Sequence, residues 1–335
     1  MVERSLRVNF FFLTDTVSSE HIYAQELQDS LIEHGIEITD DWQDADIIHL
    51  FEVNFFTSAA VSSFKFPTLL RILGSDVPVV VSLDDLYFID RPDFTAHPRL
   101  YQFNKHAQRW LLNQVDGTIA ISDSVRQNLL GTTDPDKIRT VYHGVRRAYF
   151  PDGSRPTDEG YVFHVSMASK RKNPEAIVEL ASRLNEPFLI AGSGWEEYIP
   201  RRLTRENVEL LGYVSEEELI DYYQGASIFY FPTYHEGFGL PVLEAMAAET
   251  AVVTSDVYSV PEVAGETAIL CCPDDVTAHL SNIERLLANT DERHDLARQA
   301  RARAESFTWE KAARKTEEIY RELLPPERTG TSTTR

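Results

Sequence analysis

Short apolar runs alternate with amphipathic stretches along most of this chain of 335 residues. Such alternation predicts buried β-strands that are each followed by a loop and a helix. Some runs, such as residues 77–83, are apolar almost without interruption, which is typical of strands covered on both faces in a parallel sheet. Because parallel strands need crossover helices, the expected fold class is α/β with Rossmann-like parallel sheets.

The alternation falls into two series, which predict two domains. The first series occupies residues 1–150 and the second occupies residues 161–307. Between them, residues 151–160 are polar, contain proline and glycine, and lack periodicity, so we expect a linker there. A last helix is predicted over residues 308–324, and the polar tail of residues 325–335 is expected to be disordered.

Composition restricts the possible partners. The chain has 53 acidic and 32 basic residues, which gives a formal net charge of −21. A field of this sign repels nucleic acids and anionic lipid surfaces, so a nucleic-acid role is not expected. Of the basic residues, 25 are Arg and only 7 are Lys. Excess carboxylate with little lysine suits a solution of high salt, and we hypothesise a salt-loving source.

The sequence also bears on compartment. No apolar run reaches the length of a membrane span, and residues 8–13 are too few for the core of a signal peptide. We therefore expect a cytoplasmic protein, with peripheral contact at the inner face of a membrane left open. Cys271 and Cys272 are adjacent and are the only cysteines. A structural disulfide or a cysteine metal cluster is not expected, and both are interpreted as small core residues.

An Asp-x-Asp pattern at Asp44 and Asp46 allows two interpretations. Such a pair can hold a divalent metal when it follows a strand. Here it precedes the apolar run of residues 47–51, which favours a capping role in a turn.

Residues 234–244, Tyr-His-Glu-Gly-Phe-Gly-Leu-Pro-Val-Leu-Glu, form the segment richest in candidate site residues. They follow the apolar run of residues 228–231 and precede an alanine-rich stretch, which predicts a strand, a glycine loop and a helix. Gly237 and Gly239 allow a sharp turn and close approach of a ligand to the backbone. The free N–H groups from Leu240 onward then form an anion site at the helix N-terminus.

Two carboxylates flank this anion site. Glu236 lies in the loop, and Glu244 lies in the first helical turn, where its side chain can reach back toward the same crevice. Either residue alone is equally consistent with a solvated turn or with a favourable charge at a helix start.

A second charged segment is Lys-Arg-Lys-Asn-Pro at residues 170–174, directly after an apolar run. Successive cations in so acidic a chain indicate a local anion. Arg171 can bind two phosphate oxygens in a fork, whereas Lys172 supplies a point charge. A solvated basic turn is the alternative.

The spacing of Glu236 and Glu244 within H-E-G-F-G-L-P-x-x-E-A resembles the signature of the retaining, nucleotide-sugar-dependent glycosyltransferases of family 4, the glycosyl transferases group 1 type. The resemblance is specific over residues 160–324 and loose over the first 150. It implies the GT-B architecture, in which two Rossmann-like domains face each other across a crevice. The first domain would face the acceptor, and the second would bind the nucleotide sugar. The helix of residues 308–324 would cross back to the first domain.

The resemblance also implies roles for individual residues. Arg171 and Lys172 would neutralise the departing diphosphate. Glu236 would hold hydroxyls of the transferred sugar, and Glu244 would grip the ribose. The remaining donor-binding positions would be Gly237, Phe238, Gly239, Leu240, Gly212, Tyr213, Val214, Ser166 and Gly192. No essential metal or other cofactor is expected. For this family a same-face mechanism, in which the departing phosphate accepts the proton of the acceptor, is usually favoured over a covalent intermediate, and these residues do not decide between the two.

The first domain departs from the family pattern at two places. Where relatives carry a Gly-Gly pair in the first loop, this chain has Ser and Thr residues that include Thr16. Where many relatives have His-Asp, it has Asp84 and Asp85. A carboxylate at Asp84 can bind a sugar or acceptor hydroxyl but cannot act as a neutral imidazole donor; a helix-capping pair is the alternative.

The expected function is therefore transfer of a sugar from a nucleotide-diphosphate sugar to a glycan, a lipid-linked sugar or a small metabolite. A catalytically silent nucleotide-sugar-binding subunit and a nucleotide-sugar epimerase of the same fold are the alternatives. An oxidoreductase is not favoured, because neither domain opens on G-x-G-x-x-G with a downstream acidic partner. The sugar, base, acceptor and oligomeric state are not specified by these residues.

Overall fold

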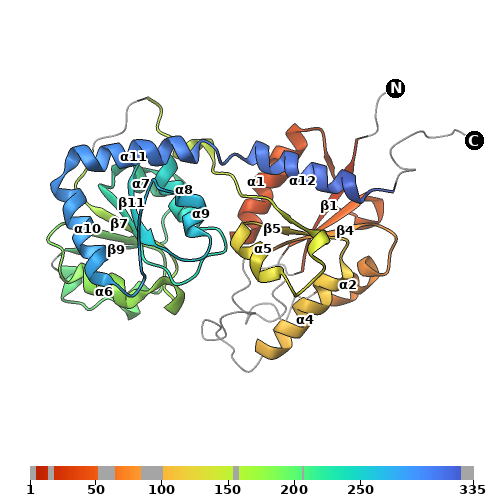
Figure 1. Cartoon of the computed structure of the whole chain (residues 1–335), viewed down its shortest axis with the longest axis horizontal. Helices are drawn as coiled ribbons and strands as arrows, with labels where there is room; N and C mark the ends of the chain where they lie inside the picture. The colour runs from red at the N-terminus through yellow and green to blue at the C-terminus, as the bar shows by residue number, and fades with distance from the viewer. Residues whose placement is uncertain are drawn as a thin grey trace, which may run out of the picture. The chain divides into compact units, whose positions relative to one another are not determined.

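The computed structural model describes residues 5–13, 19–51, 65–83, 101–153, 158–205 and 207–325. The chain divides into two compact units. Unit 1 comprises Met1–Gly144 together with Trp309–Arg335, and unit 2 comprises Val145–Thr308. Each unit contains a six-stranded sheet in which the paired strands are parallel (Figure 1). The predicted α/β class with two Rossmann-like sheets is confirmed.

In unit 1 the strands follow the order β2-β1-β3-β4-β5-β6. Every residue of β3 and β4 is buried, as expected for strands covered on both faces. The strands are β1 (Arg7–Phe12), β2 (Glu37–Ile38), β3 (Ile47–Phe51), β4 (Val79–Leu83), β5 (Gly117–Ala120) and β6 (Ile138–Thr140). The described helices are α1 (Ser19–Glu33), α2 (Phe66–Leu73), α4 (Tyr101–Gln114), α5 (Asp123–Leu129) and α12 (Trp309–Leu323).

The last helix, α12, packs against α1 although the two are far apart in sequence (Figure 1). Its Tyr320 is fully buried, and the hydroxyl lies 2.6 Å from Nδ1 of His49 on β3. Nε2 of the same imidazole lies 2.7 Å from Oγ of Ser82 on β4. Burial lowers the pKa of His49 to about 3, so the ring is neutral. A buried polar network thus connects α12 to the sheet.

In unit 2 the strands follow the order β12-β11-β10-β7-β8-β9. Numbered from the start of the unit, this is the 3-2-1-4-5-6 order of dinucleotide-binding folds, which reverses between β7 and β10. The strands are β7 (Val162–Val165), β8 (Phe188–Ala191), β9 (Val208–Gly212), β10 (Ile228–Phe231), β11 (Ala251–Ser255) and β12 (Ile269–Cys271). The helices are α6 (Pro174–Ala181), α7 (Glu216–Gly225), α8 (Leu240–Ala247), α9 (Val260–Ala264), α10 (Val276–Ala288) and α11 (Thr290–Ala304).

The units divide between Gly144 and Val145, before the segment expected to be a linker. Tyr149, just before the expected linker, is buried and makes an edge contact with Tyr223 of the same unit. At the other end of the expected linker, Asp158 pairs with Arg293 at 2.7 Å. The domain boundaries at residues 150 and 161, and the acceptor and donor sides assigned to them, stay predictions.

Smaller predictions have mixed outcomes. Cys271 is buried at the end of β12, but Cys272 is exposed, so the interpretation of both as core residues is wrong for Cys272. One carboxylate oxygen of Asp46 accepts a hydrogen bond from the backbone N–H of Arg7 at 3.0 Å. None of the helices in the described ranges combines the length and the apolar character that crossing a bilayer requires.

Candidate active site

The candidate site lies where β7 and β10 end, at the reversal of strand order in unit 2. After β7, the short 3₁₀ helix η7 (Lys170–Lys172) turns the chain into α6. Asn173 makes this turn possible, because it adopts a left-handed conformation with φ of 50° and caps α6 by accepting from the N–H of Ala176 at 3.2 Å. Pro174 then starts the helix, where a missing N–H is tolerated.

The structure brings the cationic turn and Glu236 into direct contact. Nζ of Lys172 lies 2.6 Å from Oε1 of Glu236, and Nη1 of Arg171 lies 3.2 Å from Oε2. The hydroxyl of Thr233 donates to Oε1 at 2.8 Å. Lys172 and Glu236 are 7% and 6% exposed, so this is a buried ion pair, with Arg171 half-buried beside it.

The charges of this cluster leave it positive. Burial alone would raise the pKa of Glu236, but the ammonium of Lys172 and the guanidinium of Arg171 lower it to about 2. Glu236 is therefore ionised at neutral pH, and the three groups sum to one positive charge. The ammonium of Lys172 also lies 4.5 Å from the ring centroid of Phe231, a cation–π contact.

Hydrogen bonds between loops hold the cluster in place. The N–H of Tyr234 donates to the carbonyl of Arg171 at 2.8 Å, and the hydroxyl of Ser259 donates to the carbonyl of Glu236 at 2.9 Å. Three residues after Glu236, Gly239 takes a left-handed conformation with φ of 94° and begins α8. The positive dipole end of α8 therefore lies close in sequence to Glu236. The expected run of free N–H groups from Leu240 onward is wrong, because Pro241 has no N–H and the N–H groups of Val242 and Leu243 donate to the carbonyl of Gly239 at 3.0 and 3.2 Å.

The other predicted residues of this loop are largely buried. Gly237 and Phe238 are buried, and the Phe238 ring makes an edge contact with Phe307. Leu240 is half-buried at the first position of α8. Their place beside Glu236 agrees with a loop that approaches a ligand through its backbone rather than through these side chains.

Glu244 belongs to a second cluster on the same helix. Its carboxylate accepts a hydrogen bond from the hydroxyl of Tyr223 at 2.9 Å. Burial raises the pKa of Glu244. The hydrogen bond from Tyr223 and the charge of Arg146 act in the opposite direction but do not outweigh burial. Arg146 is in turn paired with Glu216 and lies over the ring of Tyr149.

The ends of three neighbouring strands bring Ser166, Gly192 and Gly212 together. The N–H of Gly192 donates to the carbonyl of Gly212 at 2.7 Å. A Cβ atom at Gly192 would lie 2.0 Å from the carbonyl oxygen of Ser166, so only glycine fits there. Tyr213 follows with a side chain that is 93% exposed, and Val214 is half-buried.

Sequence reasoning missed Thr233, Tyr223 and His164. His164 was the most detectable, because it interrupts the apolar run of β7 and lies two residues before Ser166, on the same face of the strand. Thr233 and Tyr223 carry no comparable signal, since their roles depend on which loops meet. The predicted acceptor-side residues Thr16, Asp84 and Asp85 lie outside the described residues.

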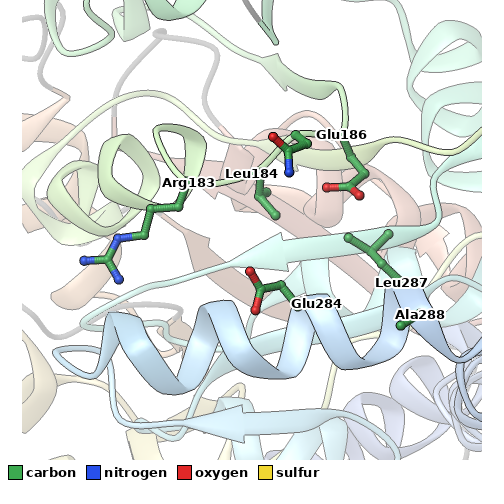
Figure 2. Close-up of a pocket in the computed structure, with 7 residues that line it drawn as sticks. Arg183, Leu184, Glu186, Glu284, Leu287 and Ala288 are labelled. Carbon is green, nitrogen blue, oxygen red and sulfur yellow. The ribbon is translucent and has the colours of Figure 1, made fainter.

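Neither a metal centre nor a second ligand site is placed beside this cluster by the described residues. Within the part of the chain that the structure describes, no group of three or more His, Cys, Asp or Glu side chains is arranged to hold a metal ion. A cavity of about 230 Å³ lies between the α6–β8 loop and α10 (Figure 2). Its lining residues are Arg183, Leu184, Asn185, Glu186, Glu284, Leu287 and Ala288. The loop leads into the amino end of β8, the opposite sheet edge from the candidate site.

Two family models match the chain. The family model described as "Glycosyl transferases group 1" matches residues 145–303, and the model "Glycosyltransferase Family 4" matches residues 23–149. Together they account for most of the chain.

Curated relatives are similar over part of their length. O-antigen chain mannosyltransferase B of Escherichia coli is 33% identical over 177 residues, which are 49% of this chain and 46% of the relative. The serotype-specific mannosyltransferase WbdA of Escherichia coli is 27% identical over 288 residues, covering 76% of this chain and 35% of the relative. The match thus spans less than half the length of either relative.

Solved structures share the fold at low identity. Sucrose-phosphate synthase from Thermosynechococcus elongatus has a TM-score of 0.78 at 18% identity, with 96% of this chain and 99% of that chain covered. The Anabaena protein HepE in complex with UDP-glucose has a TM-score of 0.72 at 15% identity, with 95% and 100% covered. With the two family models and a glutamate–cation cluster at the expected place, the chain belongs to the family 4, group 1 glycosyltransferases and has the GT-B fold.

Proposed function

We propose that this protein is a retaining glycosyltransferase that moves a sugar from a nucleotide-diphosphate sugar to a hydroxyl group of an acceptor. The contact of Arg171 and Lys172 with Glu236 beside the start of α8 carries the proposal. A diphosphate needs concentrated positive charge, and this cluster combines a net positive charge with the positive dipole end of the following helix.

The cations act on the leaving group. As the bond between sugar and phosphate breaks, negative charge grows on the departing diphosphate. Arg171 and Lys172 are already held in place, so they stabilise that charge without reorganising. Each charge-assisted hydrogen bond contributes about 1.5 to 3 kcal/mol. Because these bonds strengthen in the transition state, they lower the barrier rather than merely tightening substrate binding.

Glu236 has capacity for one further hydrogen bond. Its Oε1 already accepts from Lys172 and Thr233, whereas Oε2 forms an ion pair with Nη1 of Arg171 at 3.2 Å. A carboxylate oxygen accepts about two hydrogen bonds, so Oε2 is the atom that we assign to a sugar hydroxyl. The negative charge of the carboxylate also favours an oxocarbenium-like transition state. Glu244, oriented by Tyr223, is assigned to the ribose.

Relatives support a hexose donor and a glycan acceptor. The two curated relatives described above are named mannosyltransferases, one of them for O-antigen chains, and HepE was solved with UDP-glucose. We propose that no metal is essential, because Arg171 and Lys172 supply positive charge that a divalent ion provides elsewhere. We expect turnover to survive treatment with EDTA. A loss of turnover that Mg²⁺ or Mn²⁺ restores would contradict the proposal that no metal is essential.

The decisive experiment is a thermal-shift screen of UDP-, GDP- and ADP-linked glucose, mannose and N-acetylglucosamine, followed by mass spectrometry of products with a panel of glycan acceptors. Glu236→Ala and Lys172→Ala are expected to lower turnover by about 10²- to 10³-fold. Glu236→Gln keeps the side-chain volume, and Ser182→Ala on the exposed end of α6 is the matched control.

Three results contradict the proposal in different ways. Turnover by Glu236→Ala at the wild-type rate removes its catalytic assignment. Binding without turnover across all acceptors favours the silent subunit. An epimerised sugar released with nucleoside diphosphate favours the epimerase.

A further inference from the structure

His164 is a fully buried histidine on β7 that the proposed mechanism does not use. The ring makes an edge contact with Trp195 at a centroid distance of 5.0 Å and stacks on Phe231 at 5.6 Å. Both ring nitrogens nevertheless have polar partners. Nδ1 lies 2.9 Å from the carbonyl oxygen of Tyr230, and Nε2 lies 2.7 Å from Oγ of Ser166.

These partners fix the proton positions of the pair. A carbonyl oxygen only accepts hydrogen bonds, so Nδ1 of His164 carries the proton. Burial lowers the pKa of His164 to about 3, and the ring is therefore neutral at physiological pH. Nε2 then has a lone pair and no proton. The hydrogen bond between Nε2 and Oγ must be donated by the hydroxyl of Ser166.

The backbone of Ser166 is held as well. Its N–H donates to the carbonyl of Ala191 at 3.1 Å, and its carbonyl accepts from the indole N–H of Trp195 at 2.7 Å. The half-buried side chain directly follows β7, next to the reversal of strand order, and His164 is near enough to Lys172 for the two to interact electrostatically. The hydroxyl proton of Ser166 thus points toward His164, and the lone pairs of Oγ can still accept a hydrogen bond.

An oxygen that presents only lone pairs repels phosphate oxygens and attracts O–H groups. We propose that Ser166 accepts a hydrogen bond from a hydroxyl group of the bound nucleotide sugar, and that His164 is the positioning residue that keeps the Ser166 hydroxyl from turning toward the diphosphate. This inference rests on the function proposed above. The hydroxyl belongs either to the ribose or to the transferred sugar, and the two sources are separable by experiment.

The test is a double-mutant cycle on ligand binding, measured by calorimetry with the full chain. The ligands are the nucleotide sugar of the UDP, GDP and ADP panel that stabilises the protein most and its free nucleoside diphosphate. Ser166→Ala is expected to weaken binding about tenfold. His164→Phe should weaken it several-fold in the wild type and add nothing in the Ser166→Ala background, because it acts through that hydroxyl.

Matched variants separate this role from a structural one. Ser166→Thr retains the hydroxyl and should bind within about twofold of wild type, and Ser182→Ala, whose hydroxyl donates to the carbonyl of Glu179, should not change binding. A merely structural His164 would weaken binding equally in both backgrounds. Ser166→Ala and Ser166→Thr keep the test decisive if His164→Phe does not fold.

The outcomes are distinct. If Ser166→Ala loses affinity only for the nucleotide sugar, the hydroxyl belongs to the transferred sugar. If it loses affinity equally for the free nucleoside diphosphate, the hydroxyl belongs to the ribose. Both results support the proposal. Wild-type affinity in Ser166→Ala, or additive losses in the double variant, overturn it and leave the proposed function standing. If the wild type binds no member of the panel, the proposed function fails and this inference fails with it.

Discussion

At the scale of single residues, the ionisation of Glu236 is decided by its partners. Its pKa in the folded state is about 2, below the ordinary value of 4.5, because Lys172 and Arg171 outweigh the effect of burial. A carboxyl whose pKa is lowered on folding stabilises the protein above its unfolded pKa, and this contribution is lost as the pH falls through the folded pKa. The size of the contribution is on the order of 3 kcal/mol.

We therefore expect Glu236→Gln to be less stable than wild type at pH 6 and to approach it as the pH falls from about 4.5 toward 2. The quantity to follow is the difference in free energy of unfolding between the two proteins at each pH, because many other carboxylates of both proteins titrate in the same range. Urea unfolding of both proteins at a series of pH values measures it. Parallel stability profiles over the whole series would show that Glu236 is not held ionised by the two cations.

Glu244 behaves in the opposite sense. Its pKa is raised, chiefly by burial, so the folded state disfavours the charge that this group carries at neutral pH. The stability gained from the neutral form is present below the unfolded pKa and is lost as the pH rises through the folded pKa. A stability cost for a functional charge is expected at ligand sites.

Glu244→Gln should therefore raise the unfolding temperature at pH 7, by about 2 to 4 °C for each kcal/mol gained. The same variant should weaken nucleotide binding about tenfold. Differential scanning calorimetry and calorimetric titration with the nucleoside diphosphate check the two effects. Glu217→Gln, an exposed glutamate of α7, should change neither. A less stable Glu244→Gln would mean that the charge is compensated.

The sequence predicted the charged members of the site better than their supports. Arg171, Lys172 and Glu236 stand out because charge is conspicuous after an apolar strand, and the structure brings them together. Thr233 and Tyr223 were not predictable, because an ordinary polar residue becomes a partner only when two distant loops meet. The prediction that Cys272 is a core residue failed for a related reason: adjacency at a strand end does not say which of two neighbours faces the core.

At the scale of elements, alternation of apolar runs predicted strands and helices, but it did not predict their order in the sheets. The short runs of β7 and β10 are both largely buried, and nothing in either sequence indicates that the two strands are neighbours. The contact between the two loops nevertheless follows from that pairing. Strand order depends on crossover handedness and packing, which are properties of several elements together.

Gly192 shows where one residue decides how elements meet. It has φ of 104°, and an added Cβ would lie 2.0 Å from the carbonyl oxygen of Ser166, so β7 would have to move away from β8. Gly192→Ala should therefore destabilise the protein by more than about 3 kcal/mol and abolish nucleotide binding. Gly160→Ala is the control: φ is 81°, but no atom lies within 4 Å of the added Cβ, so only about 1 kcal/mol is expected. Denaturant unfolding measures both variants, and a similar loss in the free energy of unfolding for Gly192→Ala and Gly160→Ala would contradict the steric argument.

At the scale of the whole molecule, chain order and unit membership differ. The helix α12 comes last in the chain but belongs to unit 1, where Tyr320 is hydrogen-bonded to His49. The chain therefore passes between the units twice, at Gly144 and again before Trp309. Periodicity predicted the helix itself, and the family resemblance implied its return to the first domain. The buried tyrosine–histidine contact across 271 positions cannot be predicted from any local pattern.

The net charge of −21 also acts on the molecule as a whole. At 0.1 M salt, charges interact over about 10 Å, and at 1 M over about 3 Å, so added salt screens self-repulsion between surface carboxylates. The buried pair of Lys172 and Glu236 is shielded from solvent and is screened much less. We therefore expect the unfolding temperature to rise from 0.1 to 1 M potassium chloride and then to level off, because screening is nearly complete. A rise that continues linearly would indicate a general salt effect on hydration, and full stability in low salt followed by loss in molar potassium chloride would refute the hypothesis of a salt-loving source.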